Sequence, residues 1–488
     1  MNSQTIKKAI LSFFLCVLLF CTPASAQKNK YAPLSNAKST NAAIEALEKD
    51  IPNLMKLSDV PGISAALVRD GKIVWSKGFG FANAETKEPV TNETIFEAAS
   101  LSKVVFAYGV LKLVDEGKID LDVPLNKYLG NNYDVGDDAR LNLITARRVL
   151  SHTGGFPNWR SDENGKLPIN FTPGEKFSYS GEGFVYLSKV VEKITAMPLE
   201  DFMQKTVLIP LGMTNSSFQW QDRFKTNGAY RHDLIGNKLF RNQGKNVNAA
   251  ASLRTTAEDY AKFVAALLNG KGLKKKTLSE MFAPQINVSE KSPQVFWGLG
   301  VGLETTDEGK SFWHWGDQGD TKAYFTAFLP RKDAIIYFAN SPNGLSITKE
   351  ILDDAIGGKH PAVAHLDYGR YDNDPPRTLL KAIIEKSAAE ALKNYREQRE
   401  QPNAVKIYEF RINSIGYVLL KLKKVDDAIE VFKLNTSDFP NSANAWDSLA
   451  EGYLTKGDKE SAIKYYEKSL ELNPQNKNAA EQLNKLKP

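Results

Sequence analysis

The spacing of apolar residues predicts strands at both ends of a region that reaches to about residue 340, with helices between them. Apolar runs at 63–68 and 73–78 are separated by an Arg-Asp-Gly-Lys turn at 69–72 and predict a hairpin. Helical periodicity follows, for example at 184–196 and 257–268. Further strands are predicted at 296–304, 311–315, 322–329 and 334–339. This order predicts an α+β fold with one antiparallel sheet flanked by helices.

A strongly apolar helix is predicted to begin at Ser100. Its apolar positions cover more than one face, so we expect the helix to be buried on most sides. These positions are Val104, Val105, Tyr108, Leu111, Leu113 and Val114.

A repeat with a period of 34 residues occupies the end of the chain, where Ala428, Phe432 and Pro440 are matched by Ala462, Tyr466 and Pro474. This period predicts two tetratricopeptide-like repeats at 409–442 and 443–476, with a capping helix at 478–487. Two unrelated amphipathic hairpins are the alternative, which three matched pairs disfavour. Since two repeats rarely bury a core alone, the amphipathic segment at 376–400 is expected to pack beneath them.

The first 26 residues have the pattern of a secretory signal peptide. Lys7 and Lys8 precede an apolar run at 9–20, and Ala-Ser-Ala at 24–26 is a small-residue cleavage signal. The sequence therefore predicts export, to the periplasm or out of the cell. Cys16 and Cys21 both lie in this segment, so the mature chain would have neither disulfides nor a cysteine nucleophile.

Charge and histidine content exclude several classes of function. Removing Lys7 and Lys8 lowers the formal net charge from +6 to +4, and no arm rich in arginine and aromatic residues suggests nucleic-acid binding. No later apolar run has the length of a membrane span. His360 and His365 are too isolated for a metal site, and we expect neither a metal nor another cofactor.

The candidate chemistry begins with a Ser-x-x-Lys pattern, which occurs five times, starting at Ser25, Ser35, Ser100, Ser346 and Ser461. Only Ser100 combines an extended approach, small neighbours and an apolar helix behind it. Residues i and i+3 share a helix face, so the Lys103 amine can reach the Ser100 hydroxyl. A lysine kept partly neutral by burial can activate a serine nucleophile. The alternative is an N-cap serine with a solvated lysine.

Two further segments follow in order: Phe-Ser-Tyr-Ser-Gly at 177–181 and Trp-His-Trp-Gly at 313–316. Together with Leu-Ser-His-Thr-Gly-Gly at 150–155 and Pro-Leu-Gly-Met at 210–213, they resemble the serine β-lactamase and penicillin-binding protein family. The resemblance covers roughly 45–350 and is nearest the class C, esterase and DD-peptidase branch. It implies a β-lactamase/transpeptidase-like fold.

The resemblance also implies roles for individual residues. Ser100 would be the nucleophile and Lys103 the base, sharing the proton with Tyr179, while His314 takes the place of the lysine in the family's Lys-Thr-Gly strand. The backbone N–H groups of Ser100 and Asp317 would form the oxyanion hole.

Two glycines are expected at the substrate-binding surface. Gly316 would let the substrate approach the strand closely. Gly181 stands where many members have an asparagine that binds the acyl side chain, and Glu182 is a possible substitute that the sequence leaves open. The replacement of lysine by His314 weakens the positive charge for a substrate carboxylate. His152, in the Ser-His-Thr-Gly turn, is interpreted as scaffolding.

These observations predict an exported serine hydrolase that cleaves ester or amide bonds through an acyl-enzyme on Ser100, as an esterase, D-amino-acid peptidase or DD-peptidase. The alternatives are a β-lactamase, or a catalytically weak penicillin-binding-like protein that recruits partners through its repeats. The substrate would be a small molecule or peptide, and the repeats would bind a protein or peptide. The predicted parts are a signal peptide at 1–26, a hydrolase domain at 27–365, a helical linker at 366–408 and the repeats at 409–488.

Overall fold

A computed structural model describes residues 31–130, 133–135, 138–160, 165–401 and 407–487. The predicted signal peptide lies outside the described residues. The elements of the fold belong to the unit Leu34–Pro488.

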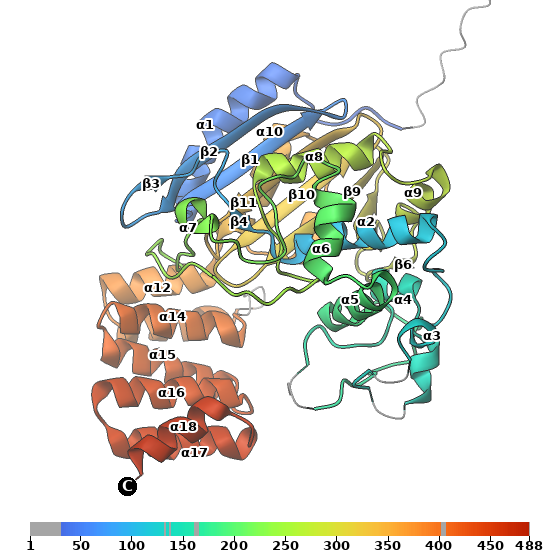
Figure 1. Ribbon diagram of the computed structural model, residues 1–488. Coiled ribbons are helices and arrows are strands. Elements are labelled where there is room, and N and C mark those ends of the chain that lie inside the picture. Colours follow the sequence, from blue (N-terminus) through green and yellow to red (C-terminus); the bar gives the residue numbers. More distant parts are fainter. Residues whose placement is uncertain (1–30, 131–132, 136–137, 161–164, 402–406, 488) are drawn as a thin grey trace, which may run out of the picture. The chain divides into compact units, whose positions relative to one another are not determined.

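The central feature of the fold is an antiparallel sheet in which, within the described ranges, nine strands take the order β3-β2-β1-β11-β10-β9-β8-β7-β6 (Figure 1). The strands are β1 (Gly62–Arg69), β2 (Lys72–Asn83), β3 (Glu88–Pro89), β6 (Ile286–Asn287), β7 (Val295–Trp297), β8 (Gly302–Thr305), β9 (Lys310–Asp317), β10 (Lys322–Phe328) and β11 (Asp333–Ala339). A separate short pair joins β4 (Phe96–Glu97) to β5 (Arg254–Thr255). The predicted antiparallel sheet of an α+β domain is thereby confirmed.

One predicted strand is wrong in extent: the segment 296–304 forms two strands, β7 and β8. The chain reverses between them because the Gly298 N–H donates to the Val301 carbonyl at 2.9 Å and Gly300 has φ +80°. A side chain at position 300 would be strained in that conformation.

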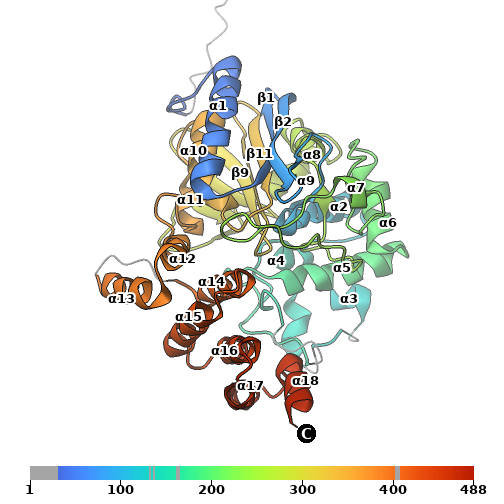
Figure 2. The same ribbon diagram turned by 90° about the vertical axis from the view of Figure 1, so that its left-hand side faces the viewer.

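Both faces of the sheet are covered, which explains why its strands are apolar runs rather than strict alternations. Ile63, Ala65 and Leu67 of β1 join the core under α1 (Thr40–Ser58) and α10 (Thr348–Ala355). Ala66 and Val68 join the core under α2 (Ser102–Asp115) and α8 (Ala257–Leu268). Figure 2 shows these two helix layers on opposite sides of β1 and β11.

The helix predicted at Ser100 is present but starts two residues later. Ala99–Leu101 form a single 3₁₀ turn that leads directly into α2, and almost every side chain of α2 is buried. Ser100 therefore lies at the helix entrance, at one end of the element that fills the larger core.

Seven further helices complete the described part of this region. They are α3 (Asn126–Leu129), α4 (Ala146–Leu150), α5 (Gly181–Thr195), α6 (Leu199–Met203), α7 (Phe224–Asn227), α9 (Lys275–Met281) and α11 (Pro361–Leu366). Within the described part of the chain, no helix is both long and apolar enough to cross a membrane.

The C-terminal region is entirely helical, as predicted. It comprises α12 (Pro375–Glu385), α13 (Ala388–Arg399), α14 (Glu409–Lys421), α15 (Val425–Asp438), α16 (Ala443–Lys456), α17 (Lys459–Leu472) and α18 (Lys477–Leu486). The segment expected as one amphipathic stretch is two helices, because the Ser387 side chain caps α13 by accepting from the Glu390 N–H. The apolar faces of α12 and α13 share a core with α14 and α15.

Candidate active site

The entrance of α2 and the end of β9 form the centre of the candidate site. Ala99 has φ +47°, an unfavourable conformation for a residue with a side chain, and it turns the chain just before Ser100. A Cβ atom at Gly316 would lie 2.6 Å from the Ala98 carbonyl oxygen. Gly316 is therefore required by the close approach of β9 to the 98–99 turn, a reason different from the substrate contact expected from the sequence.

Ser100 and Lys103 are in direct contact. The Lys103 ammonium is 3.1 Å from the Ser100 hydroxyl and donates a 2.9 Å hydrogen bond to the Ala250 carbonyl. Lys103 is fully buried, and no ion pair joins it to a carboxylate in the part of the chain that the structure describes. Burial lowers the pKa of Lys103 to about 7. At neutral pH the amine therefore loses its proton readily.

Aromatic rings surround this amine. It lies 4.8 Å from the centroid of the Tyr179 ring and 5.7 Å from that of Phe184. The rings exclude water from the amine and so disfavour its charged form. The Ala250 carbonyl gives Lys103 its direction, and because this contact is made by a backbone atom, no residue type in the sequence could have identified it.

Tyr179 is half-buried beside Ser100, with its hydroxyl oxygen buried. Burial raises the pKa of the phenol, and the proximity of the Ser100 hydroxyl opposes that shift only in part. Among the described residues, the Tyr179 hydroxyl has no partner at normal hydrogen-bond geometry. In the resting protein Tyr179 is thus a protonated phenol with an unused polar atom at the reaction centre.

His152 supports Tyr179, in agreement with its interpretation as scaffolding. Its Nδ1 accepts from the Ser180 N–H at 3.0 Å, and its carbonyl accepts from the Ser178 N–H at 2.8 Å. The two rings lie 4.3 Å apart between centroids. Burial, together with the nearby Lys103, keeps the pKa of His152 well below its usual value, so the imidazole is neutral.

His314 is a fully buried neutral side chain. Its Nδ1 lies 2.7 Å from the Trp315 carbonyl, which requires the proton to be on Nδ1. Burial and the charge of Lys103 lower the pKa of His314 to about 3. Its Nε2 is buried without a partner among the described residues. His314 therefore supplies an unprotonated nitrogen to the site and no positive charge.

The position of the missing asparagine is occupied by Trp159. A Cβ atom at Gly181 would lie 2.6 Å from the Trp159 ring, and that ring is 47% exposed. Glu182 does not serve as a substitute, because it is buried and paired with Arg160 at 3.2 Å. Sequence reasoning missed Trp159; a large aromatic residue in the Gly- and Pro-containing loop before Gly181 was the available signal.

A polar cavity of about 320 Å³ adjoins Trp159. Its other wall includes Gln318, which follows Asp317, and the segment next to Ala250. Amide side chains of Asn242, Asn246 and Asn248 line it. The cavity thus offers hydrogen-bonding groups to a ligand that is bound beside Ser100.

The Asp317 N–H group is directed away from β10. Asp317 pairs with Lys322, and the next residue, Gln318, donates its N–H to Thr321 across the same ladder. Because successive N–H groups of a strand alternate in direction, that of Asp317 points to the opposite side. On that side the neighbouring strand is β8, which pairs with β9 only from Lys310 to Trp313 and does not reach Asp317. The Asp317 N–H therefore has no strand partner in the ladder and lies at the strand end nearest Ser100.

Two models of known protein families match parts of the chain. The Beta-lactamase model matches residues 47–354, and the Tetratricopeptide repeat model matches residues 443–476, the second predicted repeat.

Two relatives and two solved structures show the range of similarity. "Protein flp" of Staphylococcus aureus (strain N315) is 27% identical over 216 residues, 41% of this chain and 42% of that protein, so the chain spans less than half the length of this relative. The "Putative penicillin-binding protein PbpX" of Bacillus subtilis (strain 168) is 25% identical over 285 residues, 54% of this chain and 69% of that protein.

The two structures share the fold. The octameric penicillin-binding protein homologue from Pyrococcus abyssi aligns with a TM-score of 0.56 and 23% identity over 70% of this chain and 82% of that chain. D-alanine carboxypeptidase AmpC from Burkholderia cenocepacia aligns with a TM-score of 0.55 and 18% identity over 64% of this chain and 99% of that chain. Because the family model matches more than half of the chain and the fold agrees, the protein belongs to the Beta-lactamase family.

Proposed function

We propose that the protein is a serine hydrolase that cleaves ester or amide bonds through an acyl-enzyme on Ser100. The observation that carries the proposal is the 3.1 Å contact between the Ser100 hydroxyl and a buried Lys103 whose pKa is lowered to about 7. A nucleophile and a base matched to neutral pH are the two groups that such chemistry needs first.

In the first half-reaction, neutral Lys103 takes the Ser100 proton as the oxygen forms a bond to the substrate's carbonyl carbon. The N–H groups of Ser100 and Asp317 stabilise the resulting oxyanion; one such donor is typically worth about 3 kcal/mol. When the bond to the leaving group breaks, the Tyr179 hydroxyl donates a proton to it and regains one from Lys103. Water then attacks the acyl carbon and gives a proton to neutral Lys103. As the bond to the Ser100 oxygen breaks, Lys103 returns that proton to the oxygen, and the carboxylic acid is released.

Three features favour esters without a carboxylate over penicillins. The family's asparagine is absent, Trp159 fills its place, and His314 is neutral and offers no charge to a substrate carboxylate. The amide-lined cavity suits an acyl group with hydrogen-bonding atoms, such as a peptide. The similarity to a putative penicillin-binding protein is compatible with D-amino-acid peptides as substrates. β-Lactam hydrolysis is the alternative activity.

We further propose that the protein is exported and that residues 1–26 are removed. N-terminal sequencing of the protein recovered outside the cytoplasm tests this, with a start near Gln27 as the expected result. A form that retains Met1 and stays in the cytoplasm would contradict it.

A second function, recruitment of a protein or peptide partner, is proposed for the repeats because the Tetratricopeptide repeat model matches residues 443–476. Such repeats commonly present an extended binding surface.

The test of the hydrolase proposal uses the chain from Gln27 with nitrophenyl esters, D-Ala-D-Ala peptides and nitrocefin. Ser100→Ala should lose all hydrolysis, while Ser461→Ala, which removes another serine of a Ser-x-x-Lys pattern, should retain it. Equal rates for Ser100→Ala and wild type on every substrate would refute the proposal. Rapid turnover of nitrocefin alone would instead favour a β-lactamase.

A further inference from the structure

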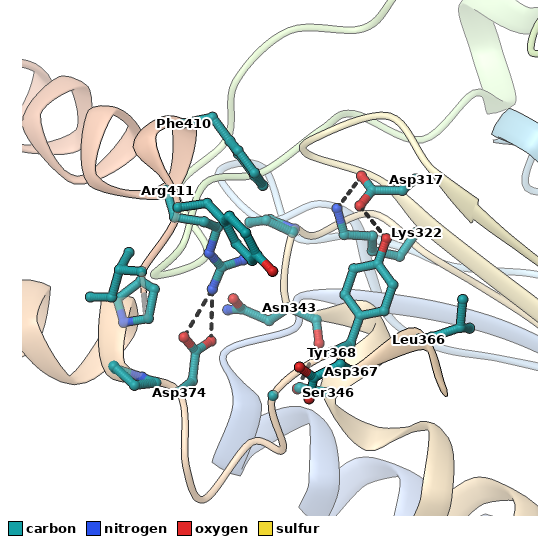
Figure 3. A pocket seen from close by; sticks show the side chains of 16 residues that line it. Asp317, Lys322, Asn343, Ser346, Leu366, Asp367, Tyr368, Asp374, Phe410 and Arg411 are labelled. Atoms are coloured by element: carbon teal, nitrogen blue, oxygen red, sulfur yellow. Dashed lines mark hydrogen bonds and ion pairs between the residues drawn. The ribbon is translucent and has the colours of Figure 1, made fainter. Parts of the chain in front are cut away.

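Tyr368 reaches the end of β9 from outside the part of the chain that the Beta-lactamase model matches. It follows α11, where Asp367 turns the chain with φ +50°. The Tyr368 hydroxyl donates a 2.7 Å hydrogen bond to Oδ2 of Asp317 (Figure 3). The ring packs against the same core as Tyr179 and Trp315.

The other carboxylate oxygen of Asp317 is also held. Lys322 of β10 forms an ion pair with Oδ1, and the Gly319 N–H donates to the same oxygen at 2.9 Å. Lys322 is only 3% exposed and donates a second bond, 2.7 Å long, to the Gly319 carbonyl. Burial tends to raise the pKa of Asp317, but Lys322, Tyr368 and the Gly319 N–H hold it below its usual value, so the carboxylate stays charged.

These contacts restrict the backbone of Asp317 as well as its side chain. The Asp317 carboxylate and the Asp317 N–H are attached to one Cα atom at the last residue of a strand, where the ladder on the β8 side has already ended. Donors on both carboxylate oxygens fix the rotation of the side chain and thereby limit the rotation of the backbone. The direction of the N–H group is thus set from two elements, β10 and the segment after α11.

We propose that Tyr368 is a positioning residue of the oxyanion hole. Together with Lys322 it holds the Asp317 carboxylate, so that the Asp317 N–H points at the substrate oxyanion that forms when Ser100 attacks. This inference rests on the proposed acyl transfer at Ser100. Tyr368 also lines a cavity of about 300 Å³, across which Arg411 pairs with Asp374 at 2.9 Å. The segment that carries Tyr368 and the helix α14, which carries Arg411, therefore line the same cavity.

The first test compares Tyr368→Phe with Tyr371→Phe in the chain from Gln27. Both remove a hydroxyl from the same segment, but among the described residues no hydrogen bond joins Tyr371 to Asp317. Tyr368→Phe should lower kcat for ester hydrolysis about 10-fold with KM within about 2-fold, because the donor is misdirected in the transition state. Binding of a boronic acid that mimics the tetrahedral intermediate should weaken by the same factor. Tyr371→Phe should change neither.

A double-mutant cycle separates positioning from loss of structure. In an Asp317→Ala background, which keeps the backbone N–H, Tyr368→Phe should have no further effect on kcat. All rates are expressed per active site, counted by complete reaction with a fluorophosphonate, so unfolded protein does not contribute.

The outcomes are distinguishable. If Ser100→Ala is as active as wild type, the proposed function fails. If Ser100 is essential but Tyr368→Phe keeps kcat within about 2-fold, or raises KM without weakening the boronic acid, the positioning role is refuted. Additive effects of Tyr368→Phe and Asp317→Ala would refute it as well.

Discussion

At the scale of single residues, the chemistry depends on Lys103 being placed among aromatic rings without a carboxylate to hold its proton. The sequence predicts the contact with Ser100 because the two residues are separated by one helical turn. It does not predict the Ala250 carbonyl or the rings, since they come from distant segments. It also contains the pattern five times, and burial separates Lys103 from Lys349 and Lys464, the exposed lysines of two other copies.

The lowered pKa of Lys103 predicts the pH profile. The neutral amine is the active base, so kcat/KM should rise with pH and level off above an apparent pKa of about 7. Lys103→Arg should reduce kcat/KM by at least about 100-fold at every pH, because a guanidinium does not lose its proton in this range. The measurement is the pH–rate profile of ester hydrolysis from pH 5 to 9. A wild-type rate that is flat across this range would contradict the assignment.

The contact between Trp159 and Gly181 predicts a compensating pair of substitutions. Gly181→Asn alone should destabilise the protein by about 1–3 kcal/mol, because its Cβ would overlap the Trp159 ring. Trp159→Ala should remove the ring contact but not the 2.8 Å approach to the Asn158 carbonyl oxygen, so the double variant should unfold at a higher temperature than Gly181→Asn but below wild type. Thermal unfolding measures this, and nitrocefin turnover shows whether the restored amide favours β-lactams. If Trp159→Ala gives Gly181→Asn no relief, the two side chains do not compete for one space.

At the scale of elements, apolar periodicity predicts most of the architecture. It places α8 at 257–268 and identifies the hairpin of β1 and β2. It fails where a short turn interrupts an apolar segment, as between β7 and β8, or where a single capping serine divides an amphipathic stretch, as at Ser387. Each interruption depends on its own local hydrogen bond, and neither changes the apolar pattern much.

Packing between the repeat helices predicts a local effect of Gly416. A Cβ atom there would lie 2.2 Å from the buried Phe432 ring. Gly416→Ala should therefore destabilise the repeats by about 1–3 kcal/mol, whereas Ser414→Ala on the same helix should be nearly neutral. Denaturant unfolding followed by tryptophan fluorescence measures the difference. Equal stability of both variants would show that α14 and α15 are not packed as described.

At the scale of the whole molecule, this member of the family carries a helical region, and the segment that connects it to the sheet contacts the candidate active site through Tyr368. The sequence predicts the family and the repeats from their motifs and period. It does not predict this contact, because Tyr368 belongs to no motif and lies far from Asp317 along the chain.

Two truncations separate the connecting segment from the helices that follow it. A chain that ends at 374 keeps Tyr368 and should retain kcat within about 2-fold per active site. A chain that ends at 365 lacks Tyr368 and should lose about 10-fold, the effect expected for the misdirected Asp317 N–H. Kinetics normalised by fluorophosphonate titration measure both. Equal activity of the two truncated chains would argue against a contribution of this segment.

The most direct test of the central claim is mass spectrometry of the chain from Gln27 after rapid acid quenching of its reaction with a nitrophenyl ester. We predict a single added acyl group, located on the peptide that contains Ser100 and absent from Ser100→Ala. The adduct should accumulate less in Lys103→Arg, because acylation then lacks its base. Hydrolysis without any adduct, or an adduct on another residue that persists in Ser100→Ala, would contradict the account.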